Sequence, residues 1–238
     1  MSLLRASSTL LAAYCAGYAY TPPQPPVSEE ERKAFRSPES KFSGFVRLWA
    51  FSLKVIWWAG GLCEAAAIVA SNSTYPPLTN HVISTLVGSA QAAAPMRVSP
   101  TFLFGVLVTV IGSYLRHCCY KALGKLFTYE LAIRNEHQLV TTGPYSMVRH
   151  PSYTGSIVAA LGIHICTFSP GTLLRQSGIL RTWVGAVIIT ATALHGVLLV
   201  SMFTTRAIFE DINMKKQFGE QWDRWAARVR YRLVPVIF

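Results

Sequence analysis

Charged residues are scarce in this sequence, and acidic residues are the scarcest among them. Only 14% of the 238 residues are charged, with 11 Asp and Glu against 22 Lys and Arg, whereas a soluble domain carries about 25% charged residues. Hydrophobic residues make up 51% of the chain. This balance argues against a soluble globular protein and makes the lipid bilayer the first solvent to consider.

Three signatures of other protein classes are missing as well. The five Cys do not have the spacing of a disulfide framework or a zinc ribbon, and His117 beside Cys118 and Cys119 has no second ligand pair, so we expect no metal site. The net charge of +11 lies between apolar runs rather than on a basic face, which disfavours nucleic-acid binding. No G-x-G-x-x-G motif follows a strand pattern, which excludes a Rossmann nucleotide site.

What the sequence does contain is a series of long apolar runs. Because about 20 apolar residues span the hydrocarbon layer as a helix, these runs predict an all-α, multi-pass transmembrane helical bundle of about five spans. The third and fourth runs are short for this purpose. The predicted spans are Leu3 to Tyr20, Phe45 to Ala70, Pro100 to Leu115, Tyr153 to Phe168 and Trp183 to Phe203.

Two segments leave alternatives open. The first run has Arg5 before an apolar core and small residues near its end, so a cleaved signal peptide is the alternative to a span. The weaker segment Leu78 to Ala94 is rich in small residues and is either a lumenal loop or a partial helix.

The distribution of basic residues predicts the orientation of the bundle. Most Lys and Arg lie in three alternate segments: between the first two spans, between the third and fourth, and after the fifth. Because basic residues accumulate on the cytoplasmic side, the N-terminus is predicted to be lumenal and the C-terminus cytosolic. Lys54 and Glu64 lie within the second span, where each is either functional or close enough to a span end to reach the interface.

The first polar region with a motif reads HQLVTTGPYSMVRHPSYTG, from His137 to Gly155. Gly143 and Pro144 predict a turn, and Pro151 suits the first turn of the fourth span. Arg149 and His150 would then lie at an open helix N-terminus, where unpaired backbone N–H groups favour an anion. The alternative is an interfacial belt that only anchors the helix.

The second polar region lies between Arg206 and Pro235, on the same predicted membrane face. Arg206 and Glu210 are four residues apart and share a helix face. Aromatic and aliphatic residues follow at helical spacing and predict an interfacial C-terminal helix. These residues are Phe218, Trp222, Trp225 and Val229.

Together the two regions resemble the isoprenylcysteine carboxyl methyltransferase family. The resemblance rests on Arg149-His150-Pro151-x-Tyr153-x-Gly155, followed by Arg206-x-x-x-Glu210, Phe218-Gly219 and a Val-Pro near the end, and it covers residues 120–235. The family's paired acid is here Glu210-Asp211, and Trp222 and Trp225 replace positions that are usually Tyr. A cofactor-contacting Gln of the family has no clear counterpart here.

The resemblance implies a membrane enzyme of the endoplasmic reticulum that uses S-adenosylmethionine to methylate the C-terminal prenylcysteine carboxylate of processed CaaX proteins. It implies N-terminal transmembrane helices over residues 1–115 and a methyltransferase core over residues 116–238. Arg206 would bind the substrate and act in catalysis. The implied cofactor-binding residues are His137, Gln138, Leu139, Val140, Tyr145, His150, Pro151, Ser152, Tyr153 and Glu210.

Two alternatives share most of these features. A shorter form of the Arg-His-Pro motif also occurs in phospholipid methyltransferases, so a small-lipid acceptor is the first alternative. A cationic Arg206 suits a carboxylate acceptor better than a lipid amine. The second alternative is a membrane scaffold that keeps the fold without turnover.

Overall fold

The computed structural model describes residues 2–25, 43–72, 77, 81–82, 84–85, 96–127 and 138–238. Within these ranges all regular structure is helical. The long helices are α1 (Ser2–Ala19), α3 (Ser43–Ser71), α5 (Pro100–Leu123), α6 (Pro151–Phe168) and α8 (Trp183–Phe218). The short ones are η3 (Gly124–Leu126), η4 (Gly143–Ser146), α7 (Leu173–Gln176), η5 (Ile179–Arg181) and α9 (Glu220–Arg228).

Four segments of the described chain are long and apolar enough to cross a membrane. They are Val46–Ser71, Pro100–Leu126, Pro151–Gln176 and Trp183–Phe218. The first predicted span, Leu3 to Tyr20, forms α1, a helix of 18 residues that contains Arg5 and is not among the four. Most of the segment Leu78 to Ala94 lies outside the described residues.

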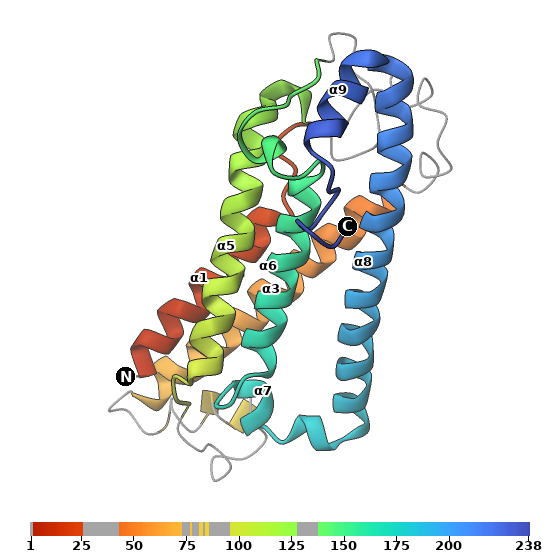
Figure 1. Cartoon of the computed structure of the whole chain (residues 1–238). Helices are drawn as coiled ribbons and strands as arrows, with labels where there is room; N and C mark the ends of the chain where they lie inside the picture. The colour runs from red at the N-terminus through yellow and green to blue at the C-terminus, as the bar shows by residue number, and fades with distance from the viewer. Residues whose placement is uncertain are drawn as a thin grey trace.

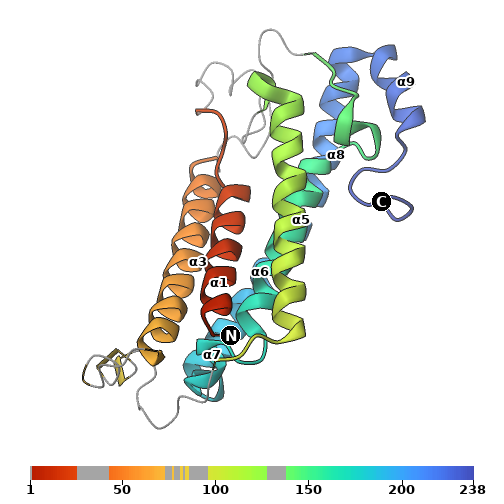
Figure 2. The ribbon, with the colours of Figure 1, turned by 90° about the vertical axis from the view of Figure 1, so that its left-hand side faces the viewer.

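The long helices form an elongated bundle with two distinct ends. Figure 1 shows α9 at the top, which we call the α9 end, and the N-terminus with α7 at the bottom, which we call the α7 end. The chain passes alternately between the two ends through α1, α3, α5, α6 and α8. Figure 2 shows α1 beside α3 and α5 beside α6. Both polar motif regions therefore reach the α9 end.

Helices α5 and α6 pack backbone to backbone through glycines spaced seven residues apart. A Cβ atom built at Gly112 would clash with the backbone of Ala159, and one at Gly162 would clash with Thr109. Gly155 in turn lies against Gly112, whose carbonyl oxygen would be 2.8 Å from an added Cβ. Small residues permit such close approach of membrane helices. The small residues of α6 therefore serve helix packing.

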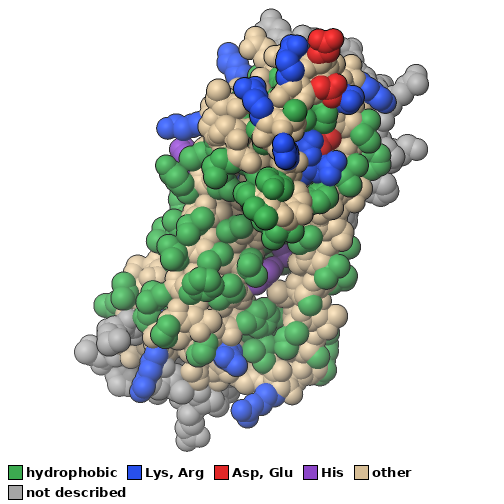
Figure 3. Space-filling view, viewed as in Figure 1, with side chains coloured by type: hydrophobic (Ala, Val, Ile, Leu, Met, Phe, Trp, Pro, Cys, Tyr) green, Lys and Arg blue, Asp and Glu red, His purple; other side chains and the backbone are tan. Residues whose placement is uncertain are grey.

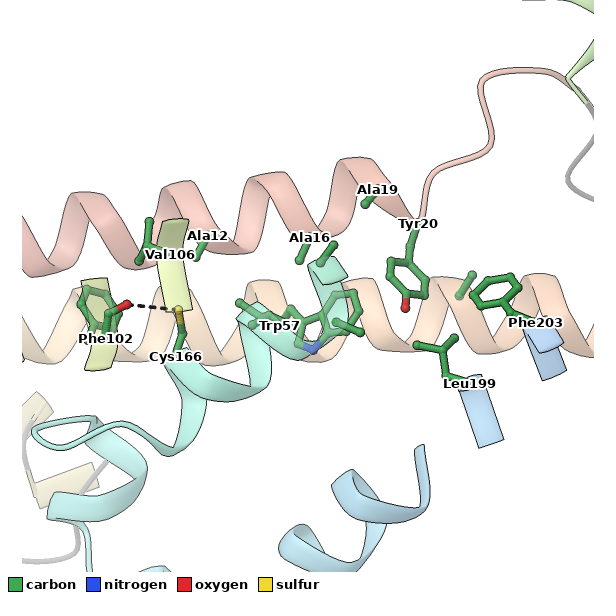
Figure 4. Packing of buried hydrophobic residues seen from close by; sticks show 14 residues of the cluster. Ala12, Ala16, Ala19, Tyr20, Trp57, Phe102, Val106, Cys166, Leu199 and Phe203 are labelled. Carbon is green, nitrogen blue, oxygen red and sulfur yellow. Dashed lines mark hydrogen bonds between the residues drawn. The ribbon is translucent and has the colours of Figure 1, made fainter. Parts of the chain in front are cut away.

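A hydrophobic core joins α1, α3, α5, α6 and α8. Alanines on one face of α1 leave room for larger side chains of the other helices, among them Trp57, Phe102 and Phe203. Figure 4 shows this face of α1 with Trp57 lying across the core and Tyr20 at the end of the helix, near Leu199 and Phe203. Cys166 on α6 donates to the carbonyl oxygen of Phe102 over 3.7 Å, which links α6 to α5 inside the core.

A buried ion pair closes the α7 end of the bundle. Arg5 of α1 donates from Nε to Glu64 Oε1 over 2.7 Å, and the Arg5 side chain is fully buried. The second carboxylate oxygen of Glu64 accepts from the backbone N–H of Leu173, 3.2 Å away. Glu64 is therefore held inside the protein, which disfavours the alternative that it extends to the interface. The pair compensates two charges that would be costly to bury alone.

The fifth span is longer than its apolar pattern predicts. Helix α8 has 36 residues and continues from Trp183 past Phe203, so Arg206 and Glu210 belong to the spanning helix itself. It ends at Gly219, whose φ of 50° is unfavourable for other residues. The stripe from Phe218 to Val229 is therefore divided between α8 and the interfacial helix α9, which begins at Glu220.

We predict that Gly162→Val destabilises the bundle by separating α5 from α6. The added side chain would meet Thr109 on α5, and overpacking of this kind costs about 1–3 kcal/mol or more. The matched control is Gly196→Val on α8, where an added Cβ meets no atom within 4 Å. Thermal unfolding in detergent measures the difference, and equal unfolding temperatures for the two variants would contradict this packing.

Candidate functional site

The polar residues of the two motif regions meet at the α9 end of the bundle. Tyr153, in the first turn of α6, donates from its hydroxyl to Glu210 Oε2 on α8 over 2.5 Å. His150 Nδ1 lies 3.5 Å from the same oxygen. The Glu210 side chain keeps 34% of its surface exposed. The convergence predicted from topology is confirmed, and it leaves one carboxylate both anchored and accessible.

The guanidinium of Arg206 lies against a stack of three rings. The ring of Tyr153 lies parallel to the imidazole of His150 at a centroid distance of 5.5 Å and to the ring of Phe203 at 4.7 Å. The Arg206 guanidinium carbon is 5.5 Å from the centroid of the Tyr153 ring. Arg206 is buried, and a cation over an aromatic face is stabilised there. The stack thus places a buried cation beside Glu210.

Asp211 is the buried anion that joins three segments of the chain. Its Oδ1 lies 2.9 Å from His150 Nε2, and its Oδ2 accepts from Arg232 Nε over 2.7 Å. Arg149 Nη1 is 3.2 Å from the same Oδ2. Asp211 therefore orients the imidazole of His150 from one side, while Glu210 faces its other nitrogen.

The C-terminal tail lies across the start of α6. The backbone N–H groups of Arg149 and His150 donate to the carbonyl oxygens of Tyr231 and Arg232, over 2.9 and 2.8 Å. Thr154 Oγ1 donates to the carbonyl oxygen of Leu233 over 2.6 Å. The tail therefore occupies the N–H groups of the two residues that precede α6, so an anion predicted at this helix N-terminus would have to bind N–H groups of α6 itself.

An apolar cluster adjoins the polar residues. Leu139 and Val140 pack against Tyr145, which is buried, and against Trp222 and Trp225 of α9. Trp225 Nε1 donates to the carbonyl oxygen of Tyr145 over 3.2 Å and fixes α9 on this segment. The arrangement provides an aromatic and aliphatic surface beside a carboxylate and a guanidinium.

Some buried polar atoms of this region lack a hydrogen-bond partner within the described chain. They include the hydroxyl oxygen of Ser152, on α6, and Nε1 of Trp222, on α9. Buried polar groups are normally hydrogen-bonded, so each such atom calls for an explanation. A ligand with donors and acceptors at this end of the bundle would satisfy them.

The structure brings together most of the residues named from the motifs. His150, Tyr153, Glu210 and Arg206 are in mutual contact through the interactions above. The others are distributed around them: Leu139, Val140 and Tyr145 in the apolar cluster, Pro151 and Ser152 buried in the first turn of α6, and Gln138 exposed. His137 lies outside the described residues.

Asp211 and Arg232 have a larger part than sequence reasoning gave them. The sequence motifs identify Asp211 only as the neighbour of Glu210, and they do not include Arg232. An acid at the membrane end of a span is a recognisable signal. The partner of that acid has no such signal, because the tail around Arg232 has neither a motif nor a helical period.

The two carboxylates determine the protonation of His150, which precedes the first residue of α6. Burial alone lowers the pKa of His150, but the hydrogen bond to Asp211 and the charge of Glu210 raise it to about 8. The ordinary value is 6.5. The imidazole is therefore largely protonated at neutral pH and acts as a donor to both acids.

Comparison with known proteins connects this site to one family. Residues 105–216 match the isoprenylcysteine carboxyl methyltransferase (ICMT) family, which confirms the resemblance of the motifs. Protein-S-isoprenylcysteine O-methyltransferase B of Arabidopsis thaliana is 30% identical over 128 residues, which are 53% of this chain and 55% of that protein. The Schizosaccharomyces pombe protein-S-isoprenylcysteine O-methyltransferase is 27% identical over 142 residues, 55% of this chain and 52% of the relative.

The human protein-S-isoprenylcysteine O-methyltransferase is 28% identical over 129 residues, 52% of this chain and 38% of the relative. The chain thus matches about half the length, or less, of these curated relatives. No solved structure matches it. The matched segment includes α6 and nearly all of α8, the two helices that carry the polar site.

We predict that the protein loses stability as the pH rises through about 8. The pKa of His150 is raised from 6.5 in the unfolded chain to about 8 in the fold, so its contribution is complete below pH 6.5 and disappears above pH 8. The shift corresponds to about 2 kcal/mol. Denaturation of the detergent-solubilised protein between pH 6 and 9.5 measures this loss.

His150→Gln is the control for this prediction. Gln keeps hydrogen-bonding capacity but does not titrate, so the variant is expected to lose most of the decline in stability between pH 6.5 and 9. An unchanged pH profile in His150→Gln would assign the decline to another group.

Proposed function

Because residues 105–216 match the isoprenylcysteine carboxyl methyltransferase family, we propose that this chain methylates the C-terminal prenylcysteine carboxylate of processed CaaX proteins. S-Adenosylmethionine is the proposed cofactor, and it supplies an activated methyl group when bound. Prenylated proteins and peptides are the proposed partners. Since the matched relatives are aligned over only about half their length, the activity and its substrate are proposals for this chain.

One observation carries the proposal: a buried cation and an anchored carboxylate lie side by side at one end of a membrane bundle. Arg206 lies over the Tyr153 ring, and Tyr153 donates to Glu210. Each charge is complementary to a different reactant of the methyl transfer. Arg206 suits an acidic acceptor, and Glu210 suits an ammonium group or ribose hydroxyls.

The acceptor carboxylate needs to be held and oriented, but it does not need a base. A terminal carboxyl group has a pKa near 3.5, so it is already ionised at neutral pH. Arg206 would bind one carboxylate oxygen by charge-assisted hydrogen bonds and leave the other free to attack. The ring stack under Arg206 limits its motion, which favours alignment of the reactants.

The residues around Glu210 fit the proposed cofactor. Leu139, Val140 and Tyr145 offer an apolar surface for an adenine ring. The partnerless Ser152 hydroxyl and Trp222 indole N–H offer hydrogen bonds to polar groups of the ligand. Because the Arg149 and His150 backbone N–H groups are taken by the tail, the cofactor carboxylate would depend on side chains such as these and on N–H groups in the first turn of α6.

The position of the site fits reactants that arrive from two phases. The prenyl chain is stabilised in lipid by about 0.8 kcal/mol per CH₂ group, so the acceptor should enter from the bilayer. Lys and Arg gather at the α9 end (Figure 3), which supports a cytosolic site and C-terminus. We propose the endoplasmic reticulum membrane as the location, with residues 1–115 as N-terminal transmembrane helices and residues 116–238 as the methyltransferase core.

We expect Arg206→Ala to abolish methylation of a farnesylcysteine analogue while binding of S-adenosylhomocysteine persists. Loss of the guanidinium removes the proposed partner of the acceptor carboxylate and leaves the cofactor residues in place. The measurement is transfer of labelled methyl groups by the purified protein, alongside titration with S-adenosylhomocysteine. Arg224→Ala, an exposed change on α9, is the matched control and should retain activity.

The same assay separates the competing acceptors. Label that appears only in phosphatidylethanolamine would assign the chain to phospholipid methylation. Absence of both cofactor binding and turnover in the wild type would identify a scaffold. Full turnover by Arg206→Ala would refute the role proposed for Arg206.

We expect Glu210→Gln to weaken S-adenosylhomocysteine binding by about 10- to 100-fold, because a lost charge-assisted hydrogen bond costs about 1.5–3 kcal/mol. Glu220→Gln removes an acid of the same size from a side chain on α9 that is 91% exposed, and it should bind normally. Isothermal titration of both variants tests the role of Glu210, and equal affinities would exclude Glu210 from the cofactor site.

A further inference from the structure

A cavity lies within the bundle, on the α7 side of the candidate functional site. It has a volume of about 520 Å³ and is bounded mainly by α3, α6 and α8. Figure 3 shows a hollow between α6 and α8, with histidine side chains at its floor. Ligand sites commonly have volumes of about 300–1,000 Å³. The cavity is therefore large enough for a ligand that the proposed methyl transfer does not use.

Two histidines supply the unusual polar feature of this cavity. His164 on α6 and His195 on α8 both line it, and His164 Nε2 lies 2.9 Å from His195 Nδ1. His195 is 95% buried, and its Nε2 atom has no hydrogen-bond partner within the described chain. A buried polar atom without a partner is destabilising, so this nitrogen points to a missing ligand group.

The tautomer of the pair limits the chemistry of that group. If His164 donates to His195 Nδ1, then His195 Nε2 carries a proton and needs an acceptor. If His195 donates instead, its Nε2 is bare and needs a donor. A hydroxyl group is both donor and acceptor and satisfies either state.

The other residues that line the cavity disfavour a charged lipid. None of the described residues that line the cavity is Lys or Arg, so an anionic headgroup would find no cation. The single acid is Glu64, whose carboxylate already receives Arg5, Thr9 and the backbone N–H of Leu173. Most of the other lining residues are apolar, including Leu53, Trp57 and Ile188.

We propose that this cavity binds a neutral membrane lipid with one hydroxyl group, which the His164–His195 pair receives. The apolar body of the lipid fills the space between α3, α6 and α8. His195 lies 11 residues before Arg206 on α8, about 16 Å along the helix axis. The bound lipid alcohol is thus distinct from the proposed acceptor, whose charged carboxylate is expected at Arg206.

Gly60 allows the cavity to be filled without disturbing the packing around it. Gly60 lines the cavity, and a Cβ atom added there meets nothing within 4 Å. Gly60→Phe should therefore occupy the binding space. Gly196→Phe is the matched control, because Gly196 has equally open surroundings and is not among the lining residues.

Native mass spectrometry of the purified protein with added cholesterol or oleyl alcohol tests the proposal and distinguishes a sterol from a linear alcohol. One alcohol per chain should bind to the wild type and to Gly196→Phe, and none should be retained by Gly60→Phe. The hydrocarbons that lack the hydroxyl group can neither donate nor accept a hydrogen bond, and we expect about tenfold weaker binding for the hydrocarbon counterpart of the preferred lipid.

The histidine itself is tested by His195→Leu and His195→Gln. The leucine variant should lose the preference for alcohol over hydrocarbon, and the glutamine variant should keep it. Retention of the alcohol by Gly60→Phe, equal binding of alcohol and hydrocarbon to the wild type, or no bound lipid at all would overturn the proposal. Displacement of the alcohol by farnesylcysteine would also overturn it, because the cavity would then belong to the acceptor. These binding measurements do not depend on methyl transfer.

Discussion

The buried carboxylate of Asp211 is the interaction on which the α9 end of the structure depends. Asp211 belongs to α8. It contacts the imidazole of His150, which precedes α6, and the guanidinium of Arg232, which lies in the C-terminal tail. A buried carboxylate is tolerated only when cations and donors surround it. Because His150 also faces Glu210, the pairing at Asp211 determines where the accessible carboxylate of the site lies. Fold stability and site geometry therefore share one electrostatic cause.

This arrangement explains how a site can form without a globular domain in water. The start of α6, the polar end of α8 and the tail each supply few contacts, and backbone hydrogen bonds from Arg149 and His150 to the tail fasten them together. At the opposite end, Arg5 and Glu64 fasten α1 to α3 in the same way. Between these two polar ends the glycine contacts of α5 and α6 keep the bundle rigid.

Helix α8 is attached differently, and this gives the middle of the bundle its open character. Figure 1 shows α8 standing away from α6 along its lower part, where the cavity with His164 and His195 lies. Near the α9 end, Phe203 stacks on Tyr153 and closes the gap. The same helix thus contributes Arg206 and Glu210 to a tight polar site and His195 to a mostly apolar cavity.

Sequence alone determined the helical class, the approximate spans and the meeting of the two motif regions at one end. Each of these follows from local apolar length and from the alternation of a chain that crosses a membrane. Tertiary structure decided the rest: that α8 continues past Phe203, that the tail occupies the N–H groups of Arg149 and His150, and that Arg5 pairs with Glu64. These outcomes depend on partners distant in sequence, which local pattern does not specify, because a buried charge or N–H group takes whichever partner the packed fold brings within reach.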